Sequence, residues 1–358
     1  MHQFPDCPEA VEPSWLTDRL MESGLLASGR VTTIEPQSIG TGQVGESVRF
    51  SLGYAGGQGP ATLAGKFASS DPTSRGTAAA LGLYAKEVRF YRELADSLDV
   101  RVPQRVAAEV DESGATFAII FEDMGPCRQG NQLAGCTIED ARHAIAQAAA
   151  LHAPSWNNPH LIDRDWLSLR PEALAQIKAL YPQAHAVFAE RYEGQLEPEL
   201  MSVCHRLNEA IDAWFDREQG ARCLIHGDFR LDNMLFDVRG GAEPIAVLDW
   251  QTVGVGSGLV DVGYFLGCGI GDRLRRESES ELLDLYCAQM TQRGVSLDRE
   301  AVWDDYRLGA LHGVSTAVFS SAFVERTERG DANFLSMARG ACALAHAHNS
   351  MDVLYGRS

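Results

Sequence analysis

The chain has 358 residues, of which 45% are hydrophobic and 22% charged, a composition typical of a globular protein with two domains or two lobes. Its 49 acidic residues outnumber the 31 basic ones and give a formal net charge of −18, which argues against a basic surface for nucleic acid. The eight cysteines show no zinc-site spacing and no run of about 18 apolar residues occurs, so we expect a cytoplasmic protein with reduced thiols and neither nucleic acid nor membrane as a partner.

The first third of the chain reads mostly as strands. Apolar residues recur at helical spacing from Pro13 to about residue 29, which predicts one leading helix. Residues 31–68 then alternate as strands do, so we expect an antiparallel meander. A helix is expected from about 77 to 98, followed by two strands at 102–110 and 115–122 that a turn connects.

A glycine-rich segment, GTGQVG, interrupts the meander with Gly40, Gly42 and Gly45 in a GxGxxG pattern. The pattern alone is weak, because dinucleotide-binding folds and kinases both use it. In a dinucleotide fold the glycines open a helix, whereas the residues after Gly45, ESVRFSL, alternate like a strand. We therefore predict a hairpin that covers nucleotide phosphates. A tight turn without a ligand is the alternative.

Lys66 lies in the third expected strand among small and apolar residues, where an inward lysine needs an anionic partner. Glu87 falls on the helical stripe that also holds Tyr84 and Tyr91, which should face the core. We predict that Glu87 pairs with Lys66 and thereby holds the lysine against nucleotide phosphates. The alternatives are an exposed strand lysine and a surface glutamate paired with a nearby base such as Lys86.

From Thr137 onward the sequence is mainly helical. The segment TIEDARHAIAQAAALHA begins with a Thr followed three residues later by Asp, which is typical of a helix start. Further helices are expected near 195–218, 278–293, 300–324 and 333–354. The exception is 222–249, where short aliphatic runs flank a polar loop.

This polar loop carries the most specific motif, HGDFRLDN, and the next aliphatic run ends at Asp249. Phosphoryl transfer needs a carboxylate that orients and deprotonates the acceptor hydroxyl, together with oxygen ligands for magnesium. Asp228 suits the first task, and Asn233 and Asp249 suit the second. Arg230 would meet the charge of the transferring phosphoryl group, and Asp232 is the weaker alternative base. A loop rich in Asp and Asn is also simply a good turn.

With HGDxxxxN followed by LDW, the chain resembles the kinase superfamily, in particular the group of aminoglycoside phosphotransferases, choline kinases and ecdysteroid-kinase-like proteins. The resemblance implies an α+β, bilobal protein-kinase-like fold. A small, mostly antiparallel β N-lobe would span residues 31–124, and a larger, mainly helical C-lobe would span 125–358. Residues 1–30 form a leading helical segment without a counterpart in this scheme.

The resemblance also implies roles for single residues. It supports Asp228 as the base, and it adds Asp261, in GLVDVGYF, as an acid that braces the catalytic loop. The strand ending IIFEDMG resembles the hinge between lobes, where backbone groups of Glu122 and Met124 would bind adenine. We interpret His152, at the end of an apolar helix, as structural.

These observations predict an enzyme that uses ATP, or GTP, with Mg²⁺ and phosphorylates a hydroxyl of a small molecule of the aminoglycoside, amino alcohol, sugar or steroid type. Only twelve positions separate Asp249 from Asp261 and no Ala-Pro-Glu follows, so a protein substrate is disfavoured. The alternative is a nucleotide-binding pseudokinase with a regulatory role. The intact base, lysine and metal ligands argue against it. A dinucleotide-dependent oxidoreductase rests on the glycines alone and is disfavoured.

Overall fold

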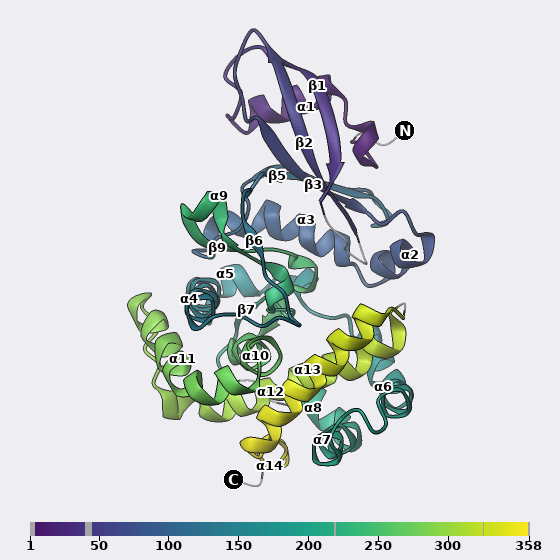
Figure 1. Cartoon of the computed structure of the whole chain (residues 1–358), viewed down its shortest axis with the longest axis vertical. Coiled ribbons are helices and arrows are strands. Elements are labelled where there is room, and N and C mark those ends of the chain that lie inside the picture. The colour runs from purple at the N-terminus through teal and green to yellow at the C-terminus, as the bar shows by residue number, and fades with distance from the viewer. Residues whose placement is uncertain (1–3, 40–44, 218–219, 325, 357–358) are drawn as a thin grey trace. The chain divides into compact units, whose positions relative to one another are not determined.

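A computed structural model of the chain describes residues 4–39, 45–217, 220–324 and 326–356. The chain forms two compact units, coloured by residue number in Figure 1. Unit 1 comprises Met1–Ser97, Arg101–Cys127 and Asp237–Val253, and unit 2 comprises Leu98–Val100, Arg128–Phe236 and Gly254–Ser358. Both the leading segment and the segment that holds Asp249 therefore belong to unit 1.

Unit 1 is built on a five-stranded antiparallel sheet in the order β1-β2-β3-β5-β4. Its strands are β1 (Arg30–Ser38), β2 (Gly45–Ala55), β3 (Thr62–Ala68), β4 (Arg105–Val110) and β5 (Phe117–Glu122). The predicted meander and both later strands are confirmed. In the central strand β3, Lys66 lies opposite Ser47 of β2 and Ile119 of β5.

The leading segment packs on this sheet (Figure 1). After a short 3-10 turn (Pro8–Ala10), helix α1 spans Pro13–Glu22 and buries Leu16 and Leu20 completely in the core of unit 1. It ends about seven residues earlier than predicted. Gly24 has φ +75°, a left-handed conformation that glycine adopts at little cost and that ends the helix.

The helix predicted at 77–98 is instead two helices, α2 (Pro72–Ala80) and α3 (Leu83–Glu93), followed by a 3-10 turn (Ala95–Ser97). The Asp71 side chain accepts a hydrogen bond of 2.7 Å from the Ser74 amide, so α2 begins before the predicted residue. Gly82 has φ +70° and separates the two helices. Helix α3 buries the predicted stripe, Glu87 included.

Unit 2 is mainly helical. Its helices are α4 (Ile138–Ser155), α5 (Pro159–Ile162), α6 (Pro171–Arg191), α7 (Pro198–Glu209), α8 (Ile211–Asp216), α10 (Leu259–Tyr264), α11 (Asp272–Gln292), α12 (Arg299–Phe323), α13 (Glu328–Ala347) and α14 (Ser350–Leu354). Helix α4 begins with the predicted capping pair, in which Thr137 and Asp140 each accept the other's amide at 3.1 Å. Within the described ranges, no helix is long and apolar enough to cross a membrane.

Two helix predictions for unit 2 need correction, and one long helix was not predicted. The expected helix at 195–218 is divided into α7 and α8, and the expected helix at 333–354 is divided into α13 and α14. Helix α6, which has 21 residues, was not predicted. Pro182 lies inside α6 and interrupts the local helical pattern, since proline is normally excluded from helix interiors. Packing against α12 and α7 stabilises this helix nonetheless.

Short strands hold the polar loop at both ends. Strand β7 (Cys223–Ile225) precedes it and pairs with β10 (Gly254–Gly256), and β8 (Met234–Asp237) follows it and pairs with β6 (Arg128–Gln129). In unit 1, a short irregular turn, α9 (Val238–Gly241), leads to β9 (Glu243–Val247) and then to Asp249 and a 3-10 turn (Trp250–Thr252).

Helices α10 and α12 lie side by side in unit 2 and touch through glycines (Figure 1). A Cβ added to Gly309 would lie 2.1 Å from the Leu259 carbonyl oxygen, and one added to Gly263 would lie 2.7 Å from the Gly309 carbonyl carbon. Only glycine permits so close an approach of two backbones. It brings Tyr264 of α10 and His312 of α12 together, with ring centroids 5.3 Å apart.

Candidate active site

The backbone of the polar loop with the HGDFRLDN motif (residues 226–233), the candidate catalytic loop, is held by a buried carboxylate. The amides of His226 and Gly227 donate to Asp261 Oδ2 and Oδ1 at 2.6 and 2.9 Å. Gly227 has φ +81°, a conformation for which glycine is best suited. Asp261 is fully buried at the start of α10, and the predicted bracing contact is confirmed.

His152 supports this brace from α4. Its Nε2 lies 3.2 Å from Asp261 Oδ2, and its Nδ1 lies 2.9 Å from the Tyr286 hydroxyl. Because a carboxylate only accepts, Nε2 carries the proton that faces Asp261. Burial alone would raise the pKa of Asp261. The hydrogen bond and charge of His152 outweigh this effect, together with the contribution of His226, and hold the pKa of Asp261 below its ordinary value. The structural interpretation of His152 is confirmed.

Three donors surround the Asp228 carboxylate. Oδ1 accepts from the Tyr264 hydroxyl at 2.8 Å, Oδ2 accepts from Asn233 Nδ2 at 2.8 Å, and Arg230 Nε contacts both oxygens, at 2.9 and 3.1 Å. Burial opposes ionisation, yet Arg230 and His226, with the hydrogen bond from Tyr264, lower the pKa of Asp228. The carboxylate is therefore ionised at neutral pH and suited to accept a proton.

Arg230 lies between two carboxylates of its own loop. Its Nη1 donates to Asp232 Oδ2 at 2.7 Å, while its Nε contacts Asp228. Asp232 Oδ1 also accepts the amide of Gln132 at 2.9 Å. The Asp232 carboxylate thus connects the loop to a neighbouring segment, which favours Asp228 as the base.

Tyr264 was not singled out from the sequence, although a signal for it exists. It follows Asp261 by three residues on α10, and residues at that spacing share a face of a helix. A helix that presents Asp261 to the loop backbone therefore presents Tyr264 to the same loop. No helix is predicted at 259–264 from the sequence, so the shared face of Asp261 and Tyr264 becomes visible only in the structure.

A second cluster lies in unit 1. Lys66 Nζ contacts Glu87 Oε2 at 2.7 Å and Oε1 at 2.9 Å, as predicted, and also Asp249 Oδ1 at 3.1 Å, which was not predicted. Burial disfavours the Lys66 ammonium, but Asp249 and Glu87 outweigh that effect and raise the pKa of Lys66. The alternative pairing is excluded, because Lys86 donates to the Val253 carbonyl and Glu87 is 1% exposed.

Helix α3 also fixes the segment around Asp249. The ring of Trp250 stacks on Phe90, with centroids 3.9 Å apart and ring planes 5° from parallel. Phe90 follows Glu87 by three residues, so one helix contacts both Lys66 and the residue after Asp249. Asp249 has φ +62°, unusual for a residue with a side chain, and strain of this kind is common at functional positions.

The predicted glycine hairpin is described only in part, because Gly40 and Gly42 lie outside the described residues. Gly45 begins β2, and a Cβ there would lie 2.9 Å from the Phe67 carbonyl oxygen. Glycine at this position is therefore explained by close strand packing. A contact between the hairpin and nucleotide phosphates stays a prediction.

The predicted hinge residues lie at and just after the end of β5. The Glu122 amide donates to the Gln104 carbonyl at 2.9 Å, and the Met124 carbonyl accepts from the Arg239 amide at 3.1 Å. These two groups are thus used within unit 1. Adenine binding by Glu122 and Met124 stays a prediction.

The chemistry of the predicted metal ligands suits Mg²⁺, which prefers hard oxygen donors. Asp249 offers a carboxylate whose side chain is 41% exposed. Asn233 uses its Nδ2 to hold Asp228, so its carbonyl oxygen is the atom that it can offer to a cation.

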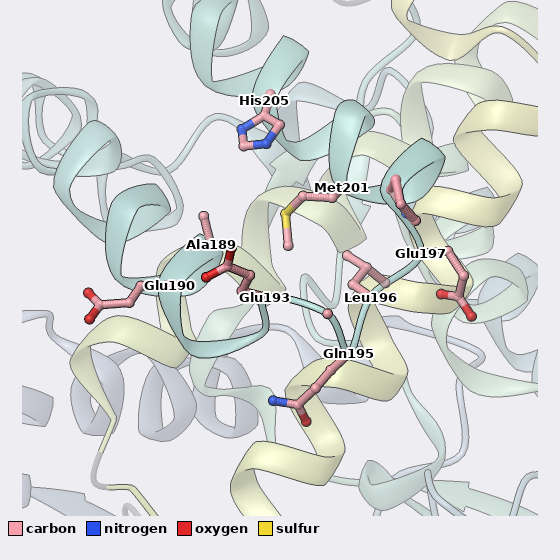
Figure 2. Close-up of a pocket in the computed structure, with 10 residues that line it drawn as sticks. Ala189, Glu190, Glu193, Gln195, Leu196, Glu197, Met201 and His205 are labelled. Carbon is pink, nitrogen blue, oxygen red and sulfur yellow. The ribbon is translucent and has the colours of Figure 1, made fainter.

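A separate surface pocket lies in unit 2 where α6 leads into α7 (Figure 2). Exposed Glu190, Glu193 and Glu197 line it, and Glu197 pairs with Arg339 at 3.2 Å. None of the residues predicted for the active site lines this pocket. It is therefore not part of the candidate active site.

Comparison with known proteins supports the kinase interpretation. Residues 71–300, more than half of the chain, match the family model described as the phosphotransferase enzyme family. A stretch of 83 residues is 34% identical to mouse acyl-CoA dehydrogenase family member 10. That match covers 23% of this chain and only 8% of the mouse protein.

Three solved structures share the fold at low sequence identity. A microcompartment-associated aminopropanol kinase is 17% identical, with a TM-score of 0.54 and coverage of 90% of this chain and 94% of that one. Choline kinase from Cryptosporidium parvum Iowa II is 12% identical, with a TM-score of 0.53 and coverage of 90% and 91%. The GDP complex of a point mutant of aminoglycoside 2'-phosphotransferase-IIIa is 15% identical, with a TM-score of 0.52 and coverage of 94% and 98%.

At these identities the structures establish the fold alone, and they confirm the predicted α+β, bilobal protein-kinase-like architecture. The family match extends over the catalytic loop, the segment of Asp249 and the brace at Asp261. This chain belongs to the phosphotransferase enzyme family.

Proposed function

We propose that this protein transfers the γ-phosphoryl group of ATP, bound with Mg²⁺, to a hydroxyl group of a small molecule. The observation that carries the proposal is the Asp228 carboxylate, which is kept ionised and oriented by three donors in a loop that Asp261 braces. A carboxylate in this state can accept the proton of an attacking hydroxyl.

Other residues have distinct tasks in this reaction. Arg230 neutralises Asp228 and Asp232 in the resting loop and supplies positive charge for the transferring phosphoryl group. Lys66, oriented by Glu87, binds the α- and β-phosphates. Asn233 and Asp249 would hold Mg²⁺, which would supply screening of the negative charge of the phosphates. The glycine-rich hairpin with Gly40, Gly42 and Gly45 covers the phosphates. Backbone groups of the hinge bind the adenine of ATP, or the guanine of GTP as the alternative donor.

The acceptor is proposed to be an amino alcohol, an aminoglycoside, a sugar or a steroid. The names of the similar structures, an aminopropanol kinase, a choline kinase and an aminoglycoside phosphotransferase, support a small hydroxyl-bearing molecule. The short interval between Asp249 and Asp261 disfavours a protein acceptor, because it leaves no room for an activation segment. We place the activity in the cytoplasm.

A pseudokinase that binds nucleotide and regulates a partner is the second candidate. It shares the Lys66–Glu87 pair with the enzyme, so nucleotide binding alone does not separate the two. Turnover does. The ionised Asp228 favours the enzyme, since a regulatory nucleotide site has no need of a base.

The first test is the melting temperature of the purified protein with ATP, with and without Mg²⁺. A ligand that binds the native state stabilises it by about 2.7 kcal/mol at 100 times its Kd. We expect Mg²⁺-ATP to raise the melting temperature of the wild type and of the control Asp18→Ala, an exposed residue of α1, but not of Asp249→Ala. An equal shift in Asp249→Ala would contradict the metal role.

The second test is ADP release in the presence of a panel of amino alcohols, aminoglycosides, sugars and steroids. Release that depends on both Mg²⁺ and one acceptor class would support the enzyme and identify its substrate. Thermal stabilisation by Mg²⁺-ATP without any turnover across the panel would favour the pseudokinase.

A further inference from the structure

Tyr264 connects the candidate base to a helix outside the catalytic loop. Its side chain is fully buried, and its hydroxyl donates to Asp228 Oδ1 at 2.8 Å. Asp261, three residues earlier on α10, holds the loop backbone at His226 and Gly227. One face of α10 therefore contacts both the backbone of the loop and the carboxylate that the loop carries.

The other donors to this carboxylate come from the loop itself. Arg230 and Asn233 follow Asp228 by two and five residues, so they move with the loop when it moves. Tyr264 belongs to a separate element, helix α10, so its hydrogen bond fixes the carboxylate relative to the helices of unit 2. Without its hydroxyl, the rotation of the Asp228 carboxylate would depend on donors from its own loop alone.

Helix α12 fixes Tyr264 in turn. A Cβ added to Gly313 would lie 3.2 Å from Tyr264 Cδ2, so the glycine leaves just enough space for the ring. The ring of His312 packs edge-on against Tyr264, and His312 Nε2 donates to the Gly227 carbonyl at 2.8 Å. The close contact of α10 with α12 thus holds both Tyr264 and the loop residue before the base.

The number of donors has a stereochemical consequence. A carboxylate has about four lone-pair sites, and three donors already contact Asp228: Tyr264 on Oδ1, Asn233 on Oδ2, and Arg230 Nε on both oxygens at 2.9 and 3.1 Å. The donors therefore crowd both oxygens, and the rotation of the carboxylate decides whether the hydroxyl of an acceptor can reach one of them. Burial and the adjacent Asp228 raise the pKa of Tyr264 well above its ordinary value, so its hydroxyl keeps its proton and remains a donor.

We propose that Tyr264 is a positioning residue for the phosphoryl-transfer step: its hydroxyl sets the orientation of the Asp228 carboxylate so that a carboxylate oxygen meets the acceptor hydroxyl. The proposal rests on the proposed function, in which Asp228 is the base. Tyr264 itself touches neither nucleotide nor acceptor in this role. It acts through Asp228, and its effect must disappear when Asp228 is altered.

The kinetic test is Tyr264→Phe, which removes the hydroxyl and keeps the ring. A hydrogen bond to a charged group is strong enough that we expect kcat to fall roughly tenfold or more, with the KM of nucleotide and acceptor changed less than about twofold. Tyr181→Phe, at another fully buried tyrosine of unit 2, is the matched control and should leave kcat unchanged.

A double-mutant cycle shows whether Tyr264 acts through Asp228. In an Asp228→Asn background, Tyr264→Phe should change the residual kcat less than about twofold, because its partner is already lost. An equal loss of kcat in both backgrounds would overturn the proposal. So would a Tyr264→Phe variant with wild-type kcat, or one in which only KM changes.

A spectroscopic test does not depend on activity. The protein has nine tyrosines, and all of them can be labelled with 3-fluorotyrosine. The ¹⁹F resonance of Tyr264 is then the one that is absent from the spectrum of Tyr264→Phe. It should move in Asp228→Asn and stay in place in Asp232→Asn, a carboxylate that contacts Arg230 instead. A Tyr264 resonance whose chemical shift is unchanged in Asp228→Asn would refute the contact. If it responds while the wild type phosphorylates no acceptor, the proposed function fails and the contact stands.

Discussion

At the residue scale, each carboxylate of the catalytic loop is placed in a different environment. Asp261 accepts two backbone amides and is fully buried, whereas Asp228 accepts side-chain donors and retains 25% of its side-chain exposure. Asp232 pairs with Arg230 and with the amide of Gln132. Three acids within one small region thus serve as brace, candidate base and structural link.

The role of Asp228 can be tested by Asp228→Asn. The amide cannot take up the acceptor proton, so we expect kcat to fall by about 10²–10⁴-fold. Nucleotide affinity, measured by titration in the absence of acceptor, should be nearly unchanged. Asp163→Asn, at an exposed residue, is the control and should behave like the wild type. Wild-type turnover in Asp228→Asn would exclude Asp228 as the base.

Asp261 should make stability depend on pH in the acid range. Its pKa is lowered in the folded state, so its contribution is fully present above the unfolded-state value of about 3.9 and is lost as pH falls through the folded-state pKa. We therefore expect the difference in unfolding free energy between wild type and Asp261→Asn to be constant from pH 7 to 5 and to narrow below about pH 4. Urea unfolding at several pH values measures it, and a gap that stays constant to pH 3 would contradict the lowered pKa.

At the element scale, the site depends on how closely two helices approach. Helix α10 supplies Asp261 and Tyr264, and helix α12 supplies His312, which holds the Gly227 carbonyl. Glycines at their contact make this spacing possible. In unit 1, helix α3 has a comparable role, because Glu87 and Phe90 fix Lys66 and Trp250.

Two glycine substitutions test the importance of this helix contact. In Gly309→Ala the new Cβ would lie 2.1 Å from the Leu259 carbonyl oxygen, so the helices must separate, and we expect a loss of about 1–3 kcal/mol in unfolding free energy. Gly76→Ala is the matched control, because its Cβ meets nothing within 4 Å inside α2. It should stabilise the protein by about 0.5–1 kcal/mol. Chemical denaturation measures both, and equal stability of the two variants would contradict the close contact.

The errors in predicted elements have local causes. Gly82 divides the helix expected at 77–98, and its effect depends on a left-handed φ that glycine permits but does not require. Pro182 lies inside α6, where packing against α7 and α12 offsets the missing backbone hydrogen bond. Propensity is a weak guide wherever tertiary contacts stabilise the opposite choice.

At the scale of the whole molecule, the dominant property is negative charge. The formal net charge is −18 at pH 7 and the isoelectric point is about 4.9. Repulsion between molecules keeps such a protein soluble at neutral pH, and it vanishes near the isoelectric point. We expect turbidity to be greatest near pH 4.9 and to fall on either side. A protein that remains clear across pH 4.5–5.5 at high concentration would contradict this expectation.

The chain also returns to unit 1 after the catalytic loop, which no local pattern indicates. Residues 237–253 belong to unit 1, and they bring Asp249 to Lys66, 183 positions earlier in the chain. The leading segment likewise joins the core of unit 1 through Leu16 and Leu20. The Phe90–Trp250 stack and the buried side chains of Leu16 and Leu20 show that apolar packing contributes to joining these segments, which lie far apart in sequence.

The sequence by itself determined the antiparallel meander, the start of α4, the Lys66–Glu87 pair and the motif around Asp228, because each depends on short-range periodicity or on the chemistry of a few adjacent residues. Only the tertiary structure decided that Tyr264 donates to Asp228 and that Asp249 is a second partner of Lys66. Those contacts join residues 36 and 183 positions apart. Their formation depends on how helices pack and on the return of the chain to unit 1. Such contacts between distant residues produce no periodic pattern in the sequence.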